Sequence, residues 1–191
     1  MPDVFDILGA DHREVKGMLT ELENGPARGS GTSEAQLQGR KELAQRLVIE
    51  SSKHEAVEEQ YFWPTVRDRV PDGDRLAGHA ISQEDEAKEV LARLDKLAPS
   101  DSEFDELVTR FIPAAREHIS YEEDTVWPLL RGILTAAEAE DLGTKVADAK
   151  KIAPTRPHPG TPSSPGVLKT AGPAVAATDK IRDSLTGRGQ G

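Results

Sequence analysis

The sequence predicts an all-α protein: an up-down-up-down four-helix bundle with a short fifth helix and a disordered Pro/Gly-rich C-terminal tail. Charged residues make up 30% and aromatic residues 4% of the 191 residues, a composition that favours helices over sheets. Apolar residues recur at steps of three and four in four long segments, which is the period of a helix with one buried face. Because modest loops join these segments, consecutive helices should run antiparallel.

The first helix is expected over residues 3–24, with Asp3 as its N-cap. Its apolar stripe consists of Phe5, Leu8, His12, Val15, Leu19 and Leu22. His12 therefore lies at the centre of the buried face. Such a histidine, taken alone, is more often a hydrogen-bonded structural residue than a metal ligand. The Gly/Pro-rich segment 24–32 then forms a connection.

A longer helix is expected over residues 33–69, followed by a turn at 70–73. Its buried seam consists of Leu43, Leu47, Glu50, His54, Glu58, Tyr61 and Thr65. Pro64 should kink this helix, because proline has no N–H to donate and its ring crowds the preceding turn.

The third helix is expected over residues 74–97 and the fourth over 102–134. The third buries Leu76, Ala80, Ala87, Val90, Leu91 and Leu94, and the fourth buries Phe104, Leu107, Phe111, Ala114, His118, Glu122 and Leu129. Pro113 should bend the fourth helix or mark a restart, and Pro128 should kink it. Thr135 and Glu138 form a capping-box pattern for a short fifth helix that ends near Lys151.

The chain divides into a bundle over residues 1–152 and a flexible tail over 153–191. The tail is dense in Pro and Gly and has little to bury, so we expect it to be disordered or to lie along the surface of the bundle. Residues 178–186 are the exception, because they could form one or two helical turns. His158 lies between two prolines in this tail, and we do not expect it to bind metal.

The net charge of −10 argues against nucleic acid and against an anionic membrane surface as partners. There is no cysteine, which excludes disulfides, thiolate metal sites and cysteine nucleophiles. Neither a signal peptide nor an apolar run of about 20 residues is visible. We therefore expect a soluble, cytoplasmic protein.

One string occurs twice: HEAVEEQYFWP begins at His54 and HISYEEDTVWP begins at His118. In both copies a Glu follows the His by four residues, as Glu58 and Glu122, so the two side chains share one helix face. An imidazole beside a carboxylate suits iron, manganese or zinc. Since each copy lies on the second helix of a hairpin, the two pairs can face each other across the bundle.

Burying several imidazoles and carboxylates without a partner costs several kcal/mol per ion. Hydrogen bonds between them offset part of this cost, but a metal offsets more and explains the spacing. Glu50 could accept the other ring N–H of His54. Tyr61 and Tyr121 lie near the buried seam. We expect them to pack in the core, with an outer hydrogen bond or direct phenolate ligation of the metal as the alternatives.

The carboxylates next to these pairs have other expected places. Glu59 and Glu123 are turned about 100° from the buried seam, toward the solvated rim or an outer hydrogen bond. Glu55 directly follows His54 and is expected at the solvated surface, with a flanking approach to the metal as the alternative.

The arrangement resembles the hemerythrin-like family, also called the HHE cation-binding domain, over residues 3 to about 150. The resemblance implies a four-helix bundle with two non-haem Fe ions and an oxo/hydroxo bridge. Three of the four helices match the family motif, through His12, His54 with Glu58, and His118 with Glu122. Glu58 and Glu122 would bridge the irons and the histidines would be terminal ligands, with Glu123 the alternative at five-residue spacing.

The third helix departs from the family pattern, which places histidines there in oxygen carriers. Aligning the apolar run puts Glu84 where a histidine is expected, with His79 as the alternative ligand. Carboxylate oxygens favour ferric over ferrous iron. We therefore expect a di-iron protein that reacts with or senses peroxide, O2 or nitric oxide in oxidative or nitrosative stress, rather than an O2 carrier.

The alternative is a non-catalytic iron or oxygen sensor or binding protein that signals through a protein partner of its tail. A ferritin-like iron store is disfavoured, because its sites use Glu-x-x-His, with the Glu first. Zinc hydrolysis is weaker still, since no His-Glu-x-x-His segment occurs.

Overall fold

The computed structural model describes residues 1–29, 31–159 and 175–184. The described residues form α1 (Val4–Asn24), α2 (Glu34–Val57), η1 (Glu58–Phe62), α3 (Trp63–Arg69), α4 (Gly73–Leu94), α5 (Ser102–Tyr121), η2 (Glu122–Val126), α6 (Trp127–Arg131) and α7 (Ala136–Lys150), with a further helix at 175–184. No strand occurs in this described part of the chain, so the all-α prediction is confirmed.

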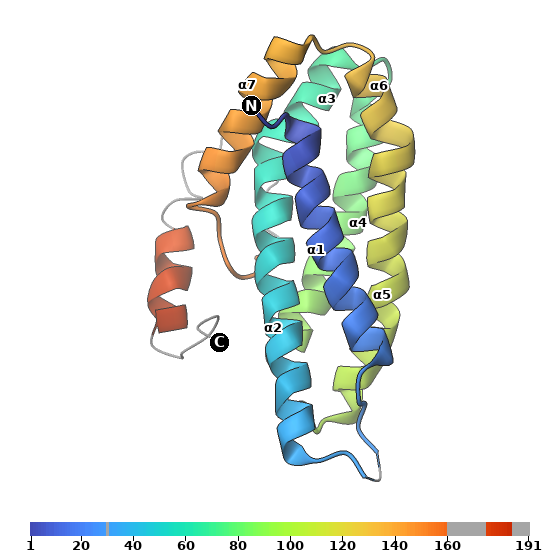
Figure 1. The fold of residues 1–191 in the computed structure, drawn as a ribbon, viewed down its shortest axis with the longest axis vertical. Helices are drawn as coiled ribbons and strands as arrows, with labels where there is room; N and C mark the ends of the chain where they lie inside the picture. Colours follow the sequence, from blue (N-terminus) through green and yellow to red (C-terminus); the bar gives the residue numbers. More distant parts are fainter. Residues whose placement is uncertain (30, 160–174, 185–191) are drawn as a thin grey trace.

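The four long helices α1, α2, α4 and α5 lie side by side along the length of the molecule (Figure 1). Their direction alternates along the chain, which is the predicted up-down-up-down order. The fifth helix, α7, packs against α1 and α2 near the N-terminus.

Capping boxes begin three of the helices. The side chains of Asp3, Ser33 and Thr135 each accept a hydrogen bond from a backbone N–H three residues later, and the side chain at that later position bonds back to the cap. Asp3 and Thr135 are the caps that the sequence predicts. These reciprocal bonds satisfy N–H groups that have no partner inside the helix.

Each copy of the repeated string contains a π-helical turn, η1 in the first copy and η2 in the second. The N–H of Trp63 bonds to the carbonyl of Glu58, five residues earlier, and Trp127 bonds to Glu122 in the same way. A proline follows each Trp and cannot continue the regular ladder. The predicted kinks at Pro64 and Pro128 thus coincide with widened turns, whereas α5 continues through Pro113.

Two apolar clusters fill the bundle and leave a polar layer between them. The Trp-end cluster contains Phe5, Leu8, Phe62, Trp63, Val66, Leu76, Ala80, Trp127 and Leu130, among others. The Phe-end cluster contains Val15, Leu19, Leu47, Val48, Val90, Leu91, Phe104, Phe111 and Ile119, among others. On each long helix, the polar layer falls where the chain passes from one cluster to the other.

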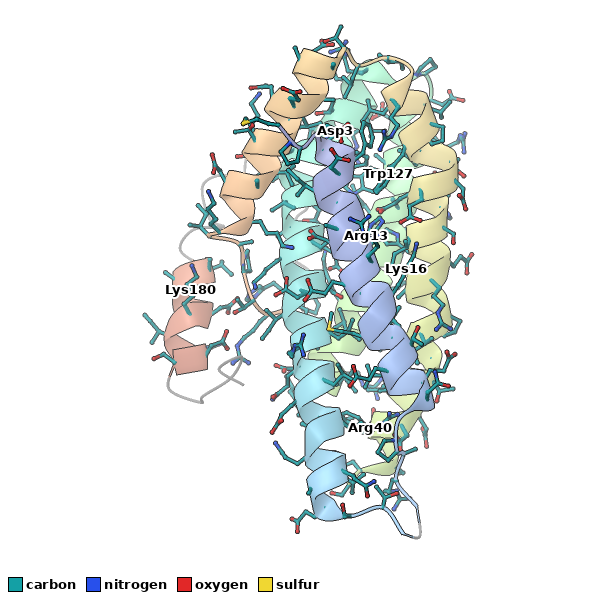
Figure 2. All side chains as sticks on the ribbon, viewed as in Figure 1. Asp3, Arg13, Lys16, Arg40, Trp127 and Lys180 are labelled. Atoms are coloured by element: carbon teal, nitrogen blue, oxygen red, sulfur yellow. The ribbon has the colours of Figure 1, made fainter. Side chains whose placement is uncertain are left out.

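A buried arginine ties three elements together at the Phe end of the bundle. Arg40 of α2, labelled in Figure 2, donates from Nη1 to the carbonyl of Leu22 at 2.5 Å. Its Nε donates to Asp105 of α5 at 3.0 Å. These bonds fix the ends of α1, α2 and α5 relative to one another.

The described part of the tail contacts the bundle. Arg156 bonds to Asp95, just after α4, at 3.1 Å and to Asp183 in the helix 175–184 at 2.7 Å. Lys180, labelled in Figure 2, donates to the carbonyl of Lys151 at 3.1 Å. The predicted helical turns at 178–186 thus correspond to this helix. For 160–174 and 185–191, the prediction of disorder lies outside the described residues.

Candidate metal centre

The polar layer collects side chains from all four long helices. α1 supplies His12, α2 supplies His54, α4 supplies Glu84 and α5 supplies His118. The π turns η1 and η2 supply Glu58 and Glu122 as their first residues. Both of these carboxylates are fully buried, with 0% exposure. All six residues are the metal ligands that the sequence predicts.

The six side chains form two groups of four that share two carboxylates. In one group, ligand atoms of His12, His54, Glu58 and Glu122 all lie within 4.8 Å of one another. In the other, the same holds for Glu58, Glu84, His118 and Glu122. Glu58 and Glu122 therefore lie between two positions that each have the donors for one cation.

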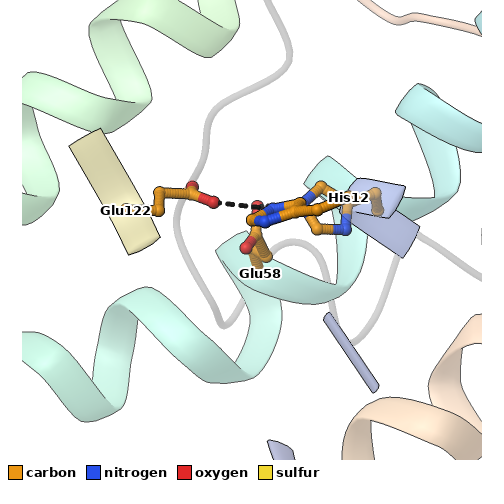
Figure 3. Close-up of side chains that lie close together, drawn as sticks. His12, Glu58 and Glu122 are labelled. Atoms are coloured by element: carbon orange, nitrogen blue, oxygen red, sulfur yellow. Dashed lines mark hydrogen bonds and ion pairs between the residues drawn. The ribbon is translucent and has the colours of Figure 1, made fainter. Parts of the chain in front are cut away.

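Contacts inside the layer are short. His12 Nε2 lies 3.0 Å from Glu122 Oε2, a contact marked in Figure 3. His54 Nε2 lies 3.1 Å from Glu58 Oε2, and His118 Nε2 lies 3.1 Å from Glu122 Oε1. Figure 3 shows the carboxylates of Glu58 and Glu122 directed toward the ring of His12.

The outer nitrogen of each histidine meets an oxygen acceptor. The Nδ1 atoms of His12, His54 and His118 lie 2.9 Å from Glu123, 3.3 Å from Asp11 and 3.1 Å from Gln83, respectively. A carboxylate or amide oxygen only accepts, so each Nδ1 carries the proton. When a ring is neutral, its Nε2 therefore directs a lone pair into the layer, as in metal-bound histidine.

His12 and His54 bring two of these lone pairs together, because their Nε2 atoms lie 3.1 Å apart. With both protons on the outer nitrogens, no hydrogen bond can form between the two rings. A shared cation would turn this repulsive contact into a favourable one, since neutral imidazole nitrogens are common metal ligands.

Each outer carboxylate has a lysine partner. Asp11 contacts Lys150 at 2.5 Å, Glu123 contacts Lys16 at 2.7 Å, and Glu59 contacts Lys88. Burial would raise the pKa of Asp11 and of Glu123, but their histidine and lysine partners lower both. These acids therefore stay ionised, as acceptors of an imidazole proton must be.

Several buried atoms of the layer have no hydrogen-bond partner among the described residues. They are both carboxylate oxygens of Glu58, both of Glu122, Oε2 of Glu84 and Nε2 of His118. Native proteins leave few such atoms, and each costs about 1–3 kcal/mol or more when charged. Six of the ten unpartnered buried atoms among the described residues thus belong to the two groups of four, so this donor set fits a pair of metal ions.

Without metal, the layer is electrostatically strained. Burial and the neighbouring Glu122 raise the pKa of Glu58, and burial and Glu58 raise the pKa of Glu84 well above its usual range. Burial would lower the pKa of His54, but Glu58 and Asp11 outweigh it and raise that pKa well above its usual value. The chain has therefore collected more negative charge than its own side chains neutralise.

Comparison with known proteins agrees with this geometry. The family model described as the hemerythrin HHE cation-binding domain matches residues 3–130. The chain belongs to this family. An uncharacterised hemerythrin-like protein of Schizosaccharomyces pombe is 23% identical over 186 residues, covering 97% of this chain and 87% of that protein.

Two further proteins are similar to this chain. A DNA nickase of Nostoc is 25% identical over 150 residues, covering 78% of this chain but only 39% of the nickase. The crystal structure of an HHE cation-binding domain-containing protein from Mycobacterium kansasii superposes with a TM-score of 0.64 at 21% identity. It covers 79% of this chain and 86% of that one, which establishes a shared fold.

In this HHE domain Glu84, and not His79, is the residue of α4, the third long helix, that lies at the centre. Glu84 is buried and accepts a hydrogen bond from Trp63 Nε1 at 2.6 Å, which leaves Oε2 for the layer. His79 is exposed and packs edge-on against the ring of Tyr121. The alternative ligand therefore lies on a different face of α4.

The expectation for Glu50 is wrong, because Asp11 holds the outer nitrogen of His54. Glu50 instead contacts Lys53 at 2.7 Å and Lys150 at 3.5 Å. The physical reason is that the ring of His54 extends across to α1, where Asp11 lies. Two ammonium groups meanwhile hold Glu50 on the side of α2.

The other flanking residues are also placed. Tyr121 donates to the carbonyl of Leu76 at 3.2 Å, and Tyr61 packs against the Trp-end cluster. Glu59 is buried with Lys88, and Glu123 bonds His12, as outer hydrogen-bonding residues. The surface prediction for Glu55 is wrong: it is buried and burial raises its pKa to about 8, since α4 covers this side of α2.

Asp11, Gln83 and the indole N–H of Trp63 are the partners that sequence reasoning did not find. Asp11 directly precedes His12 in an otherwise apolar stripe, which was a usable signal. Nothing local distinguishes Gln83. His158 pairs with Asp179 at 3.0 Å and is in neither ligand group.

Proposed function

We propose that this HHE domain holds two non-haem iron ions with an oxo or hydroxo bridge, and that the centre reacts with peroxide, O2 or nitric oxide. His12 and His54 would bind one ion, Glu84 and His118 the other. Glu58 and Glu122 would bridge them. The observation that carries the proposal is that both carboxylates belong to both groups of four.

The donor chemistry supports iron. Imidazole and carboxylate suit iron, and four protein donors per ion leave coordination positions for an external ligand. An iron pair in this setting supplies two electrons to a bound oxidant when both ions pass from ferrous to ferric. The protein side chains supply the rest: they orient the donors, exclude water and compensate charge.

The asymmetry between the two groups favours reaction over reversible O2 carriage. One group has two imidazoles and two carboxylates, and the other has one imidazole and three carboxylates. Anionic oxygen donors stabilise ferric iron. An O2 carrier must return readily to the ferrous state. A centre of this kind would do so less readily than one rich in histidine.

Packing around the histidines supports a rigid centre. The indole of Trp127 stacks on the ring of His12 with centroids 5.0 Å apart and an interplanar angle of 11°. His12 is thus held by a stacked ring on its face and by Glu123 on its edge. This prepares the ring for a cation before the cation arrives, which lowers the cost of binding.

Metal analysis of the purified protein tests the proposal, together with its absorption spectrum before and after addition of peroxide or nitric oxide. We expect two irons per chain, near-ultraviolet oxo-to-iron bands and ferrous iron that peroxide oxidises within one turnover. Glu122→Ala should remove most of the iron, whereas Glu14→Ala on the exposed face of α1 should not. One tightly bound ion per chain would contradict the shared carboxylates.

A second candidate is a sensor that signals through the tail. It is favoured by a chain of contacts from His54 to Asp11 and from Asp11 to Lys150, the last residue of α7. Lys151 follows and accepts the bond from Lys180 of the helix 175–184. Hydrogen exchange in that helix should then change when iron binds. Unchanged exchange would contradict the sensor and leave the reactive centre as the remaining candidate.

Neither nucleic acid nor a membrane is proposed as a partner. The nickase match covers 39% of that protein, and this chain carries a net charge of −10. Among the residues that the structure describes, no helix combines the length and apolar character that crossing a membrane requires. Small oxidants, and a protein partner for the tail in the second candidate, are the partners that we propose.

A further inference from the structure

A cavity of about 280 Å³ lies directly beside the metal centre. Its inner end is formed by three histidines of the centre, His12, His54 and His118. Two polar neighbours, Glu55 and Gln83, complete this end. Its outer end lies at the exposed residues Glu86, Arg110 and Glu117 of α4 and α5. The cavity therefore connects solvent with the centre through the α4–α5 seam.

The walls between these two ends are mainly apolar. They consist of Val15, Ala87, Val90, Phe111, Ala114, Ala115 and Ile119, with Ser51 as the one polar residue among them. Ala87 on α4 and Ala115 on α5 are small residues between two packed helices. A leucine at either position would extend into the space that the alanines leave.

The cavity is too large for the small oxidants alone. Hydrogen peroxide and O2 are close in size to water, which occupies about 30 Å³ in the liquid. An apolar protein cavity of about 150 Å³ is known to hold a benzene molecule. The volume and the apolar walls thus match an organic group of several carbon atoms, with its polar end at the histidines.

We propose that this cavity binds the organic part of a hydroperoxide, ROOH, in which R is apolar and uncharged and no larger than a cumyl group, a benzene ring with a three-carbon branch. The proposal rests on the proposed iron chemistry and specifies its substrate class. The peroxide group would lie at the end formed by His12, His54 and His118. The mouth carries two carboxylates against one guanidinium, so a neutral R is favoured over a carboxylate-bearing one.

The reaction balances with the iron pair as reductant. The O–O bond of ROOH breaks, and the two oxygens take up two electrons and two protons to give one alcohol, ROH, and one water. The electrons come from two ferrous ions, which become ferric, and the protons come from solvent. No other reactant is needed for a single turnover.

Binding is tested first, and without turnover, with 2-phenyl-2-propanol, the alcohol that cumene hydroperoxide leaves. We expect this alcohol to shift the methyl resonances of Val15, Val90 and Ile119 in the full-length protein, with and without iron. Ala87→Leu should weaken binding by about tenfold or more, as filling an apolar pocket does. Ala92→Leu is the matched control, because Ala92 is a half-buried alanine of α4 that does not line the cavity.

Single-turnover oxidation of the ferrous protein is tested next, with cumene hydroperoxide and with hydrogen peroxide. The ratio of the two rates should fall by about tenfold or more in Ala87→Leu and in Ala115→Leu, and should stay at the wild-type value in Ala92→Leu. Two filling variants on different helices guard against a folding defect in one of them.

The outcomes separate the two proposals. Failure of the alcohol to bind at millimolar concentration, or equal rate ratios in the filling and control variants, would overturn the cavity assignment even if hydrogen peroxide oxidises the iron. Binding that Ala87→Leu weakens, in a protein whose iron reacts with neither peroxide, would uphold the cavity as an apolar binding site and overturn peroxides as its reactants.

Discussion

At the scale of single residues, the acceptors behind the histidines matter as much as the ligands. Asp11 and Glu123 decide which ring nitrogen carries the proton, and Gln83 does the same for His118. Metal centres commonly lose affinity when such partners are removed, although the ligands themselves remain.

Asp11→Asn should lower the affinity for iron by about 10–100-fold, because the amide no longer fixes the ring of His54 as a charged acceptor does. Competition with a chelator of known affinity measures the change. Glu50→Gln is the control, since Glu50 does not contact His54 in the structure. A loss in Glu50→Gln without a loss in Asp11→Asn would show that Glu50, as the sequence predicts, is the partner.

Iron binding should compete with protons. The pKa values of His54 and His118 are raised in the metal-free protein, because Glu58 and Glu122 outweigh the effect of burial. A raised pKa means that the ring keeps its second proton to higher pH than a free imidazole does, and iron must displace that proton to bind. Apparent affinity should therefore rise with pH until both rings are neutral.

Calorimetry in two buffers of different ionisation enthalpy checks this prediction, because released protons change the measured heat. We expect at least one proton to be released per chain at neutral pH. Binding that is independent of pH between about 6 and 8 would be inconsistent with the raised pKa values, since histidine titrates in this range.

At the scale of elements, the repeated string produces the same local structure twice. A π turn begins at Glu58 in the first copy and at Glu122 in the second, and each ends before Trp-Pro. π turns occur frequently at functional sites. Here Glu58 and Glu122 belong to both groups of four, while Trp63 and Trp127 pack into the Trp-end cluster.

The N-terminus of α7 should make stability depend on acid pH. Bonds from Arg69 and Thr135 lower the pKa of Glu138 from its usual value to about 2. A depressed pKa contributes stability above about pH 4.5, and this contribution is lost as pH falls toward 2. Glu138→Gln should thus lower the thermal midpoint at pH 7 and leave it unchanged near pH 2.

Thermal unfolding at both pH values measures this difference, followed by far-ultraviolet circular dichroism. Glu140→Gln serves as the control, because Glu140 lies on the same helix but neither caps it nor bonds Arg69. A Glu138→Gln defect of equal size at pH 7 and pH 2 would assign the effect to lost packing instead of charge.

At the scale of the whole molecule, the polar layer lowers the stability of the bundle and provides its binding site. Two apolar clusters hold the four helices together, and the layer between them brings fully buried carboxylates close to one another. A bound cation repays this cost by mass action, by about 2.7 kcal/mol when its concentration is a hundred times Kd.

Removing one buried charge should therefore raise the stability of the metal-free bundle and weaken metal binding. Glu58→Gln should raise the free energy of unfolding of the metal-free protein at neutral pH, because burial and Glu122 raise the pKa of Glu58 and so make its ionised form costly in the folded state. It should also abolish binding of the second iron. Glu14→Gln, at an exposed site of α1, should change stability by less than about 0.5 kcal/mol.

Chemical denaturation of metal-free protein measures the first effect and metal analysis the second. A Glu58→Gln protein less stable than the metal-free wild type would mean that the polar layer satisfies itself through hydrogen bonds, without need of a cation.

Helical periodicity, caps and the repeated string were sufficient to predict the all-α bundle and five of the six side chains of its polar layer. These features depend on contacts one turn apart, where spacing along the chain equals position on a helix face. The choice of Glu84 over His79 came from aligning the apolar run of the third long helix with that of the hemerythrin-like family, because the core fixes the rotation of α4.

Contacts between helices were decided only by the tertiary structure. Asp11 in place of Glu50, the burial of Glu55 and the cavity behind Ala87 depend on how far one helix lies from the next. The π turns likewise depend on two prolines and a core that holds the following Trp. Spacing along one chain segment determines which side chains share a face of its helix. Packing between helices determines which other side chains that face contacts.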